Sequence, residues 1–247
     1  MPYVTMGYPS IEATMKAVPL LAESGADIIE LGIPFSDPQA DGVTVQNASF
    51  QAIKNGVTPA ACLDMARELR KKVDLPLVFM LYYNSVFHYG LKEFCNQCVE
   101  SGIDGLIIPD LPPEEGAELQ VVAEEKEIDL IYLLAPTSSE DRIKLVGEKS
   151  GGFIYMVSVT GVTGARDALP TDLEGFVNRV RKLVNKPLCV GFGIATPEHA
   201  GRVAAIADGV IVGSRIVQYM EEDASLAGLA GFVKELRQML DRSATGS

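Results

Sequence analysis

The sequence contains no tryptophan, only two histidines and four cysteines, and fewer basic residues (21) than acidic ones (33). The net charge of −12 argues against nucleic acid as a partner, because that binding depends on Lys and Arg contacts to phosphate. No run approaches the roughly 18 apolar residues that a membrane-spanning helix needs, and no basic segment followed by an apolar one marks an N-terminal signal. We therefore expect a soluble, cytoplasmic protein that binds neither nucleic acid nor membrane.

The cysteines and histidines form no metal or redox motif. Cys95 and Cys98 make a C-x-x-C pair, but LKEFCNQCVE has helical spacing, and no second pair or histidine follows at the spacing of a zinc site. We predict no metal site and interpret all four cysteines as buried, reduced thiols. His88 and His199 have no partner that the sequence identifies, so both are interpreted as surface or loop residues.

The 247 residues, 47% of them hydrophobic, are enough for one large core. Short apolar runs with little polar alternation indicate buried parallel strands. They lie at residues 2–6, 28–31, 76–82, 105–109, 130–134, 153–157, 188–190 and 209–212. Helical patterns alternate with them at about residues 10–24, 91–101, 113–126, 138–150, 172–185 and 197–205, with two more between the second and third strands. This alternation favours an α/β fold, a single-domain (β/α)8 TIM barrel over residues 1–242 rather than an open doubly wound sheet, with a disordered tail at 243–247.

One predicted strand is interrupted by a carboxylate. Burying Glu30 inside an apolar run is costly without a partner, so it is either hydrogen-bonded or placed where the strand meets a cleft. Asp41 lies further along, in a loop of turn-forming residues, PFSDPQADG. A carboxylate at the end of a strand and another on the loop above it can face the same pocket.

Glycines follow the seventh and eighth predicted strands, in GFGIAT (191–196) and GSRI (213–216). Both loops lead into a helix start, where free backbone N–H groups and the helix dipole attract an anion. In (β/α)8 barrels the loops after these two strands often bind phosphate. The pair therefore predicts a phosphate site, although the same glycines also suit simple tight turns. The small, glycine-rich loop at 158–167 is either a lid over a ligand or an ordinary connector.

These motifs occur together, in the same order, in one known family. PYVTMGYPS, ELGIPFSDPQADG, SVTGVTG, GFGIATPEH and VGSRIV resemble the tryptophan synthase alpha chain family, from Pro2 to about Leu240. The resemblance implies a lyase of tryptophan biosynthesis that cleaves indole-3-glycerol phosphate to indole and glyceraldehyde 3-phosphate, a retro-aldol reaction without a cofactor. It implies that Glu30 is the general acid/base, and that Asp41 hydrogen-bonds the indole N–H and stabilises the positive charge developing there.

The resemblance also implies further substrate contacts and a partner. The partner is a tryptophan synthase beta chain carrying pyridoxal phosphate, in an alpha2beta2 complex, while this chain itself needs no cofactor. The implied substrate-binding residues are Tyr3, Tyr82 and Tyr155 at the indole pocket or the carboxylates, Thr163 and Gly164 on the lid loop, and Phe192, Gly193, Gly213 and Ser214 at the phosphate rim.

Two features depart from the family pattern. Family members usually have a helix before the first strand, whereas this chain reaches that strand at once, so either the chain is shortened or the N-terminal mouth of the barrel is covered in another way. Val43 stands where the family commonly has Pro, on the loop that bears Asp41 and faces the partner.

Two alternatives for the function stay open. One is a stand-alone lyase that releases free indole, and the other is a weakly catalytic subunit that acts as an allosteric partner. An epimerase or a Schiff-base aldolase is less favoured, because no predicted strand carries a central Lys.

Overall fold

The computed structural model describes residues 1–157, 172–191 and 193–245, and these contain nine strands and eleven helices. The strands are β1 (Tyr3–Thr5), β2 (Ile29–Gly32), β3 (Leu77–Met80), β4 (Gly105–Ile107), β5 (Asp129–Ile131), β6 (Leu133–Leu134), β7 (Ile154–Val157), β8 (Leu188–Gly191) and β9 (Gly209–Val210). The helices are α1 (Ile11–Glu23), α2 (Val43–Lys54), α3 (Pro59–Arg70), α4 (Tyr83–Tyr89), α5 (Leu91–Glu100), α6 (Ala117–Glu125), α7 (Glu140–Lys149), α8 (Leu173–Arg181), α9 (Pro197–Ala204), α10 (Ser214–Glu222) and α11 (Ala227–Thr245).

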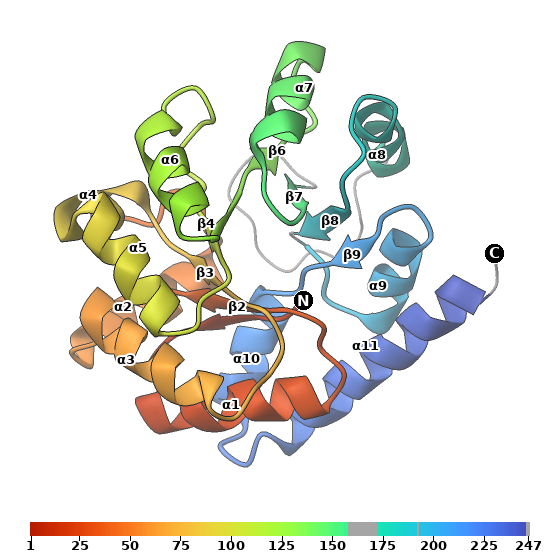
Figure 1. Ribbon diagram of the computed structural model, residues 1–247. Coiled ribbons are helices and arrows are strands. Elements are labelled where there is room, and N and C mark those ends of the chain that lie inside the picture. The colour runs from red at the N-terminus through yellow and green to blue at the C-terminus, as the bar shows by residue number, and fades with distance from the viewer. Residues whose placement is uncertain (158–171, 192, 246–247) are drawn as a thin grey trace.

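The strands form a closed parallel barrel with the helices outside it (Figure 1). Strands β1 to β5 make one run of paired neighbours, and β6 to β9 make a second. A bridge between Pro2 and Val212 closes the ring, with the Tyr3 N–H donating to the Val212 carbonyl at 2.9 Å. Because only Tyr132 separates β5 from β6, these two form one barrel strand, and the predicted (β/α)8 barrel is confirmed.

The division of the predicted strand at 130–134 has a local cause. The backbone N–H of Tyr132 donates to the side-chain oxygen of Ser150 at 3.0 Å instead of to a neighbouring strand. Its carbonyl accepts the N–H of Tyr155 of β7 at 3.1 Å. The first half of the strand, β5, thus pairs with β4, and the second half, β6, pairs with β7. The barrel therefore stays closed across the interruption.

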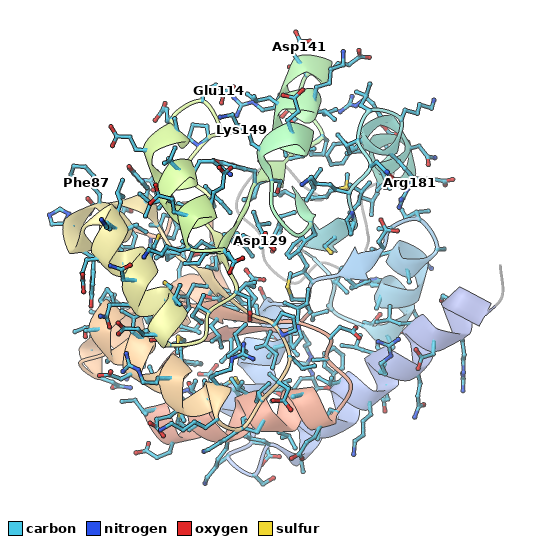
Figure 2. All side chains as sticks on the ribbon, in the orientation of Figure 1. Phe87, Glu114, Asp129, Asp141, Lys149 and Arg181 are labelled. Carbon is cyan, nitrogen blue, oxygen red and sulfur yellow. The ribbon has the colours of Figure 1, made fainter. Side chains whose placement is uncertain are left out.

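Burial explains why the strands are so uniformly apolar. Every residue of β2, β3 and β8 is buried, because the barrel interior covers one face of the strands and the helices cover the other. Side chains such as Phe87 and Asp141 point outward from the ring of helices (Figure 2). None of the described helices is long and apolar enough to cross a membrane.

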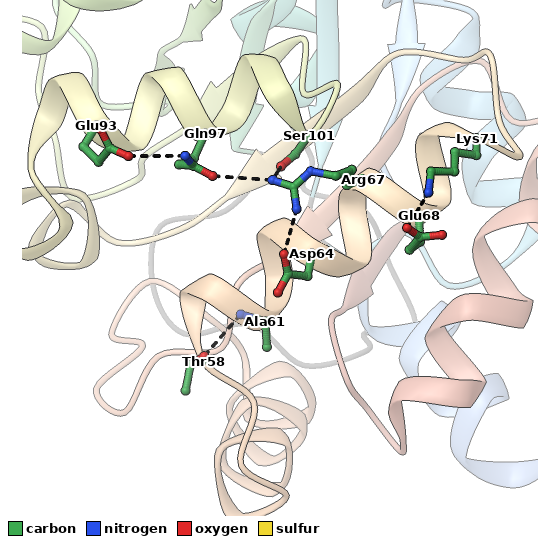
Figure 3. Close-up of polar contacts among 9 residues, drawn as sticks. All are labelled: Thr58, Ala61, Asp64, Arg67, Glu68, Lys71, Glu93, Gln97 and Ser101. Atoms are coloured by element: carbon green, nitrogen blue, oxygen red, sulfur yellow. Dashed lines mark hydrogen bonds and ion pairs between the residues drawn. The ribbon is translucent and has the colours of Figure 1, made fainter.

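Polar contacts hold neighbouring outer helices together, as in the pair α3 and α5 (Figure 3). The Thr58 side chain caps α3 by accepting the Ala61 N–H at 3.2 Å. Arg67 of α3 donates to Asp64 at 2.7 Å and reaches Gln97 and Ser101 of the α5 region at 3.4 Å. These contacts fix the outer helices, while the site residues lie on the barrel.

The N-terminal mouth of the barrel contains a cavity of about 690 Å³. Its lining includes Met1, and no helix precedes β1 in the described residues. Three carboxylates at its rim are ion-paired: Asp27 with Arg237 at 3.0 Å, Asp104 with Arg70 at 2.8 Å, and Asp208 with Arg181 at 3.0 Å. These pairs tie the turns that enter the strands to the surrounding helices.

Several sequence predictions need correction. His88 is exposed, as predicted, but lies in α4 rather than in a loop. His199 is not a surface residue, because α9 turns it inward until only 8% of it is exposed. The helix expected from residue 113 begins at Ala117. Helix α11 continues to Thr245, whereas the sequence predicted a disordered tail from residue 243. All four cysteines are buried and free, as predicted.

Candidate active site

Residues predicted from separate motifs meet in one cavity at the C-terminal ends of the strands. This is the end at which (β/α)8 barrels carry their chemistry. The predicted residues that line the cavity are Tyr3, Glu30, Asp41, Tyr155, Gly193, Gly213 and Ser214. The cavity at the opposite mouth is larger, but three of its rim carboxylates are already held in ion pairs, so we place the candidate site here.

Glu30 is the most unusual group in the cavity. It lies in the middle of β2, paired in register with Tyr3 of β1 and Val78 of β3, and none of its surface is exposed. Neither carboxyl oxygen has a hydrogen-bond partner among the described residues. Burial, reinforced by the negative charge of Asp41, raises the pKa of Glu30 to about 8, so the group holds its proton at neutral pH.

Asp41 is held by the turn that precedes α2. Its N–H donates to the Pro38 carbonyl at 3.0 Å, and its own carbonyl accepts the side-chain amide of Gln46 at 2.9 Å. Only 7% of the residue is exposed. Burial raises the pKa of Asp41 to about 6, while a hydrogen bond from Tyr82 opposes that rise. At neutral pH the pair therefore consists of one protonated and one ionised carboxyl group.

Tyr82 joins the Asp41 loop to the end of the third barrel strand. Its hydroxyl donates to Asp41 Oδ2 at 3.1 Å and accepts the Ala40 N–H at 2.9 Å. The ring of Phe35 stacks on it, with 4.9 Å between centroids. Among the described residues Tyr82 contacts the carboxylate but does not line the cavity.

Tyr3 and Tyr155 form part of the wall beside Glu30. Burial and the nearby carboxylates raise the pKa of both phenols, so both are neutral. Each ring lies against a glycine. A Cβ at Gly32 would lie 2.1 Å from the Tyr3 hydroxyl, and one at Gly191 would lie 2.7 Å from the Tyr155 hydroxyl. The glycines that end β2 and β8 thus leave the space that the two phenols occupy.

The helices α9 and α10, which follow the two glycine loops at the cavity, differ in how their first turns are capped. In α9 the side chain of Thr196 accepts the His199 N–H, so that helix is capped internally. In α10 the N-cap is Gly213, which offers no side chain, and Ser214 begins the helix. Unpaired N–H groups at a helix start attract an anion, so α10 is the better anion site of the two. Gly193 lines the same region with a φ of +79°.

The remaining predicted residues, Thr163, Gly164 and Phe192, lie outside the described residues. The structure also adds cavity residues that were not among the predicted site residues, namely Gly42, Val45, Met80, Ile194, Ala195, Ile211 and Arg215. Met80 ends β3 and Ile211 directly follows β9, so the rule that (β/α)8 barrels carry their sites at the C-terminal ends of the strands could have identified both. Among the described residues, no group of three or more potential ligands could hold a metal ion.

Comparisons with known proteins agree on one family. The sequence profile of the family described as tryptophan synthase alpha chain matches residues 1–243. A tryptophan synthase alpha chain from Dehalococcoides mccartyi is 59% identical over 97% of this chain and 94% of its own length. One from Geobacter sp. is 48% identical over 96% of this chain and 90% of its own length.

Solved structures lead to the same family. A structure of Mycobacterium tuberculosis tryptophan synthase matches with a TM-score of 0.91 at 37% identity, covering 97% of this chain and 91% of that one. A crystal structure of the tryptophan synthase alpha chain from Legionella pneumophila matches with a TM-score of 0.89 at 35% identity, covering 98% and 90%.

Proposed function

This chain belongs to the tryptophan synthase alpha chain family, and from that premise we propose that it cleaves indole-3-glycerol phosphate to indole and glyceraldehyde 3-phosphate. The observation that carries the proposal is Glu30, a fully buried carboxyl group without a described partner, facing the same cavity as Asp41 and an uncapped helix start. This arrangement provides an acid, a second carboxylate and an anion site within one pocket.

The reaction needs one proton delivered and one removed. The bond between C3 of the indole ring and the glycerol phosphate side chain breaks, C3 gains a proton, and the hydroxyl on the adjoining carbon loses one as it becomes the aldehyde. Glu30 holds its proton at neutral pH because its pKa is about 8. We assign it both steps: it gives its proton to the ring and, once ionised, accepts the hydroxyl proton.

Asp41 complements this role as the ionised member of the pair. Protonation at C3 places positive charge on the indole nitrogen, and a carboxylate facing the N–H stabilises that charge as it appears. Tyr82 supports Asp41 by donating to one of its oxygens, which keeps the carboxylate oriented. Tyr3 and Tyr155, neutral and buried beside Glu30, would border the ring.

The phosphate end of the substrate would lie at the start of α10. Gly213 and Ser214 line the cavity there, as does Gly193. First-turn N–H groups and the dipole of the helix favour a phosphate at this position. We also assign substrate roles to Thr163, Gly164 and Phe192 on the basis of the family resemblance.

The proposal extends to the setting in which the reaction occurs. Family membership supports a cytoplasmic enzyme of tryptophan biosynthesis. It also supports a beta-chain partner that carries pyridoxal phosphate, in an alpha2beta2 assembly. The chemistry assigned to Glu30 and Asp41 calls for no cofactor in this chain.

The test is the formation of indole and glyceraldehyde 3-phosphate from indole-3-glycerol phosphate by the purified chain, alone and with a tryptophan synthase beta chain. We expect slow release that rises strongly when the beta chain is added. Fast release that the beta chain leaves unchanged would identify a stand-alone lyase. Absence of both products under both conditions would refute the proposed reaction.

A further inference from the structure

The proposed substrate poses an electrostatic problem that the glycine loops do not solve alone. The cavity contains Glu30 and Asp41, and the chain carries a net charge of −12, yet the substrate brings a phosphate into the same space. Among the described residues that line the cavity, Arg215 is the only Lys or Arg. It is also the second residue of α10, beside the proposed phosphate position.

Among the described residues, the guanidinium of Arg215 contacts only side chains of its own helix. It lies over the Tyr219 ring, 4.1 Å from the centroid. It donates to the side chain of Gln218 at 3.1 Å and lies 3.4 Å from Glu222. The side chain is 29% exposed. In this position the guanidinium lies beside residues C-terminal to Arg215, away from the uncapped first turn of α10.

The ion pair with Glu222 is weak enough to be exchanged for another anion. A strong charged hydrogen bond between nitrogen and a carboxylate is about 2.7–2.9 Å long, well below the separation from Glu222. Exposed ion pairs contribute only about 0–1 kcal/mol. Helical side chains ordinarily point back toward the N-terminus of their helix. A change of rotamer in that ordinary direction takes the guanidinium toward the start of α10.

We propose that Arg215 is a phosphate-recognition residue that leaves Glu222 and binds the phosphate of the substrate. This inference rests on the proposed function and adds a substrate-binding side chain to it. The first-turn N–H groups define where the phosphate sits, and the planar guanidinium supplies full positive charge and paired donors to it. Glu222 is the anion that holds Arg215 until substrate arrives.

The test compares Arg215→Gln, Arg215→Lys and Glu222→Gln with the wild type. Glycerol 3-phosphate is the probe, its Kd is measured by calorimetry, and thermal melting confirms that each variant is folded. We expect Arg215→Gln to weaken binding about tenfold and to raise KM for indole-3-glycerol phosphate more than it lowers kcat. The Kd of the Arg215→Lys variant should lie between those of Arg215→Gln and the wild type. Glu222→Gln should bind the probe at least as tightly as the wild type, because the competing anion is gone.

Weaker phosphate binding by Arg215→Gln but not by Glu222→Gln would distinguish phosphate recognition from a structural role of Arg215. If the Arg215–Glu222 pair only stabilised α10, both substitutions would weaken binding together, and that result would overturn the inference. A folded Arg215→Gln variant with wild-type affinity would overturn it too. In either case the wild type would still release indole, so the proposed function would stand. A wild type that neither binds the probe nor releases indole would refute both.

Discussion

Glu30 and Asp41 show how one cavity can keep two carboxyl groups in different protonation states. Glu30 is sealed inside β2 with no described partner, so its neutral form is favoured. Asp41 has a hydrogen bond from Tyr82, which favours its ionised form and limits the rise of its pKa. Because the two groups repel each other when both are charged, the ionised Asp41 also favours the protonated form of Glu30. The difference between their environments makes Glu30 the acid and leaves Asp41 ionised to stabilise positive charge.

This difference predicts a bell-shaped dependence of kcat/KM on pH. Activity should fall below about pH 6, as Asp41 gains a proton, and above about pH 8, as Glu30 loses the proton that it must donate. The measurement is the initial rate of indole formation at low substrate concentration between pH 5 and pH 9.5. A flat profile across this range would contradict the assignment.

A second prediction concerns Tyr82. Because its hydroxyl lowers the pKa of Asp41, Tyr82→Phe should move the acidic side of the profile to higher pH and reduce kcat/KM. The free energy of unfolding should fall by about 1–3 kcal/mol, since a buried hydrogen bond to a charged group is lost. The neighbouring Tyr83→Phe is the matched control, because the Tyr83 hydroxyl makes no hydrogen bond among the described residues. Equal pH profiles for the two variants would show that Tyr82 does not act on Asp41.

The sequence identified Glu30 because it interrupts an apolar strand, and Asp41 because it lies on the loop that follows that strand. A carboxylate inside an apolar strand and an Asp in a loop of turn-forming residues were visible without a structure. The absence of a partner for Glu30 and the Tyr82 contact with Asp41 were not visible, because they depend on residues distant in sequence. Arg215 stood inside a recognised motif, but only the shape of the cavity gave it a possible role.

At the scale of the elements, several outer helices begin at a Ser or Thr whose side chain caps the first turn. Ser10, Ser139 and Thr196 cap α1, α7 and α9 through their side chains, and each precedes an amphipathic segment. Such caps pair backbone N–H groups that the helix itself leaves free. They therefore help to define where each outer helix begins.

Thr58 gives the clearest test of this effect. Its side chain caps α3 and does not line the cavity, so Thr58→Ala should lower the free energy of unfolding by about 1 kcal/mol without changing lyase activity. Thr58→Ser keeps the capping oxygen, so its free energy of unfolding should stay within about 0.3 kcal/mol of the wild-type value. Urea unfolding measures both. Equal stability of the Ala and Ser variants would mean that the cap contributes nothing.

Element boundaries were harder to predict where distant contacts decide them. The run at 130–134 reads as one strand, yet the Tyr132 N–H bonds to Ser150, which no local pattern indicates. His199 looked like an exposed polar residue, but α9 turns it inward. The sequence indicated the helix start after Gly213 that became α10, but the long C-terminal helix α11 was not anticipated. In each case tertiary packing outweighed the local signal.

At the scale of the whole molecule, the closed barrel brings motifs that are far apart in sequence to one rim. Strand β1 lies between β2 and the segment at Val212, so Tyr3, Glu30 and Gly213 become neighbours of a single cavity. Parallel strands and right-handed crossovers place all the carboxyl ends on the same side. This is why alternation of strands and helices was enough to predict both the fold and the end at which the site lies.

The central claim is that this barrel cleaves indole-3-glycerol phosphate with Glu30 as its acid/base, and Glu30→Gln tests it most directly. The amide keeps the shape of the side chain but cannot exchange the proton. The measurement is indole formation with a beta chain present, together with the Kd of glycerol 3-phosphate. We predict a loss of activity of about a hundredfold or more, with phosphate binding retained. A folded Glu30→Gln variant that forms indole at the wild-type rate would contradict the account.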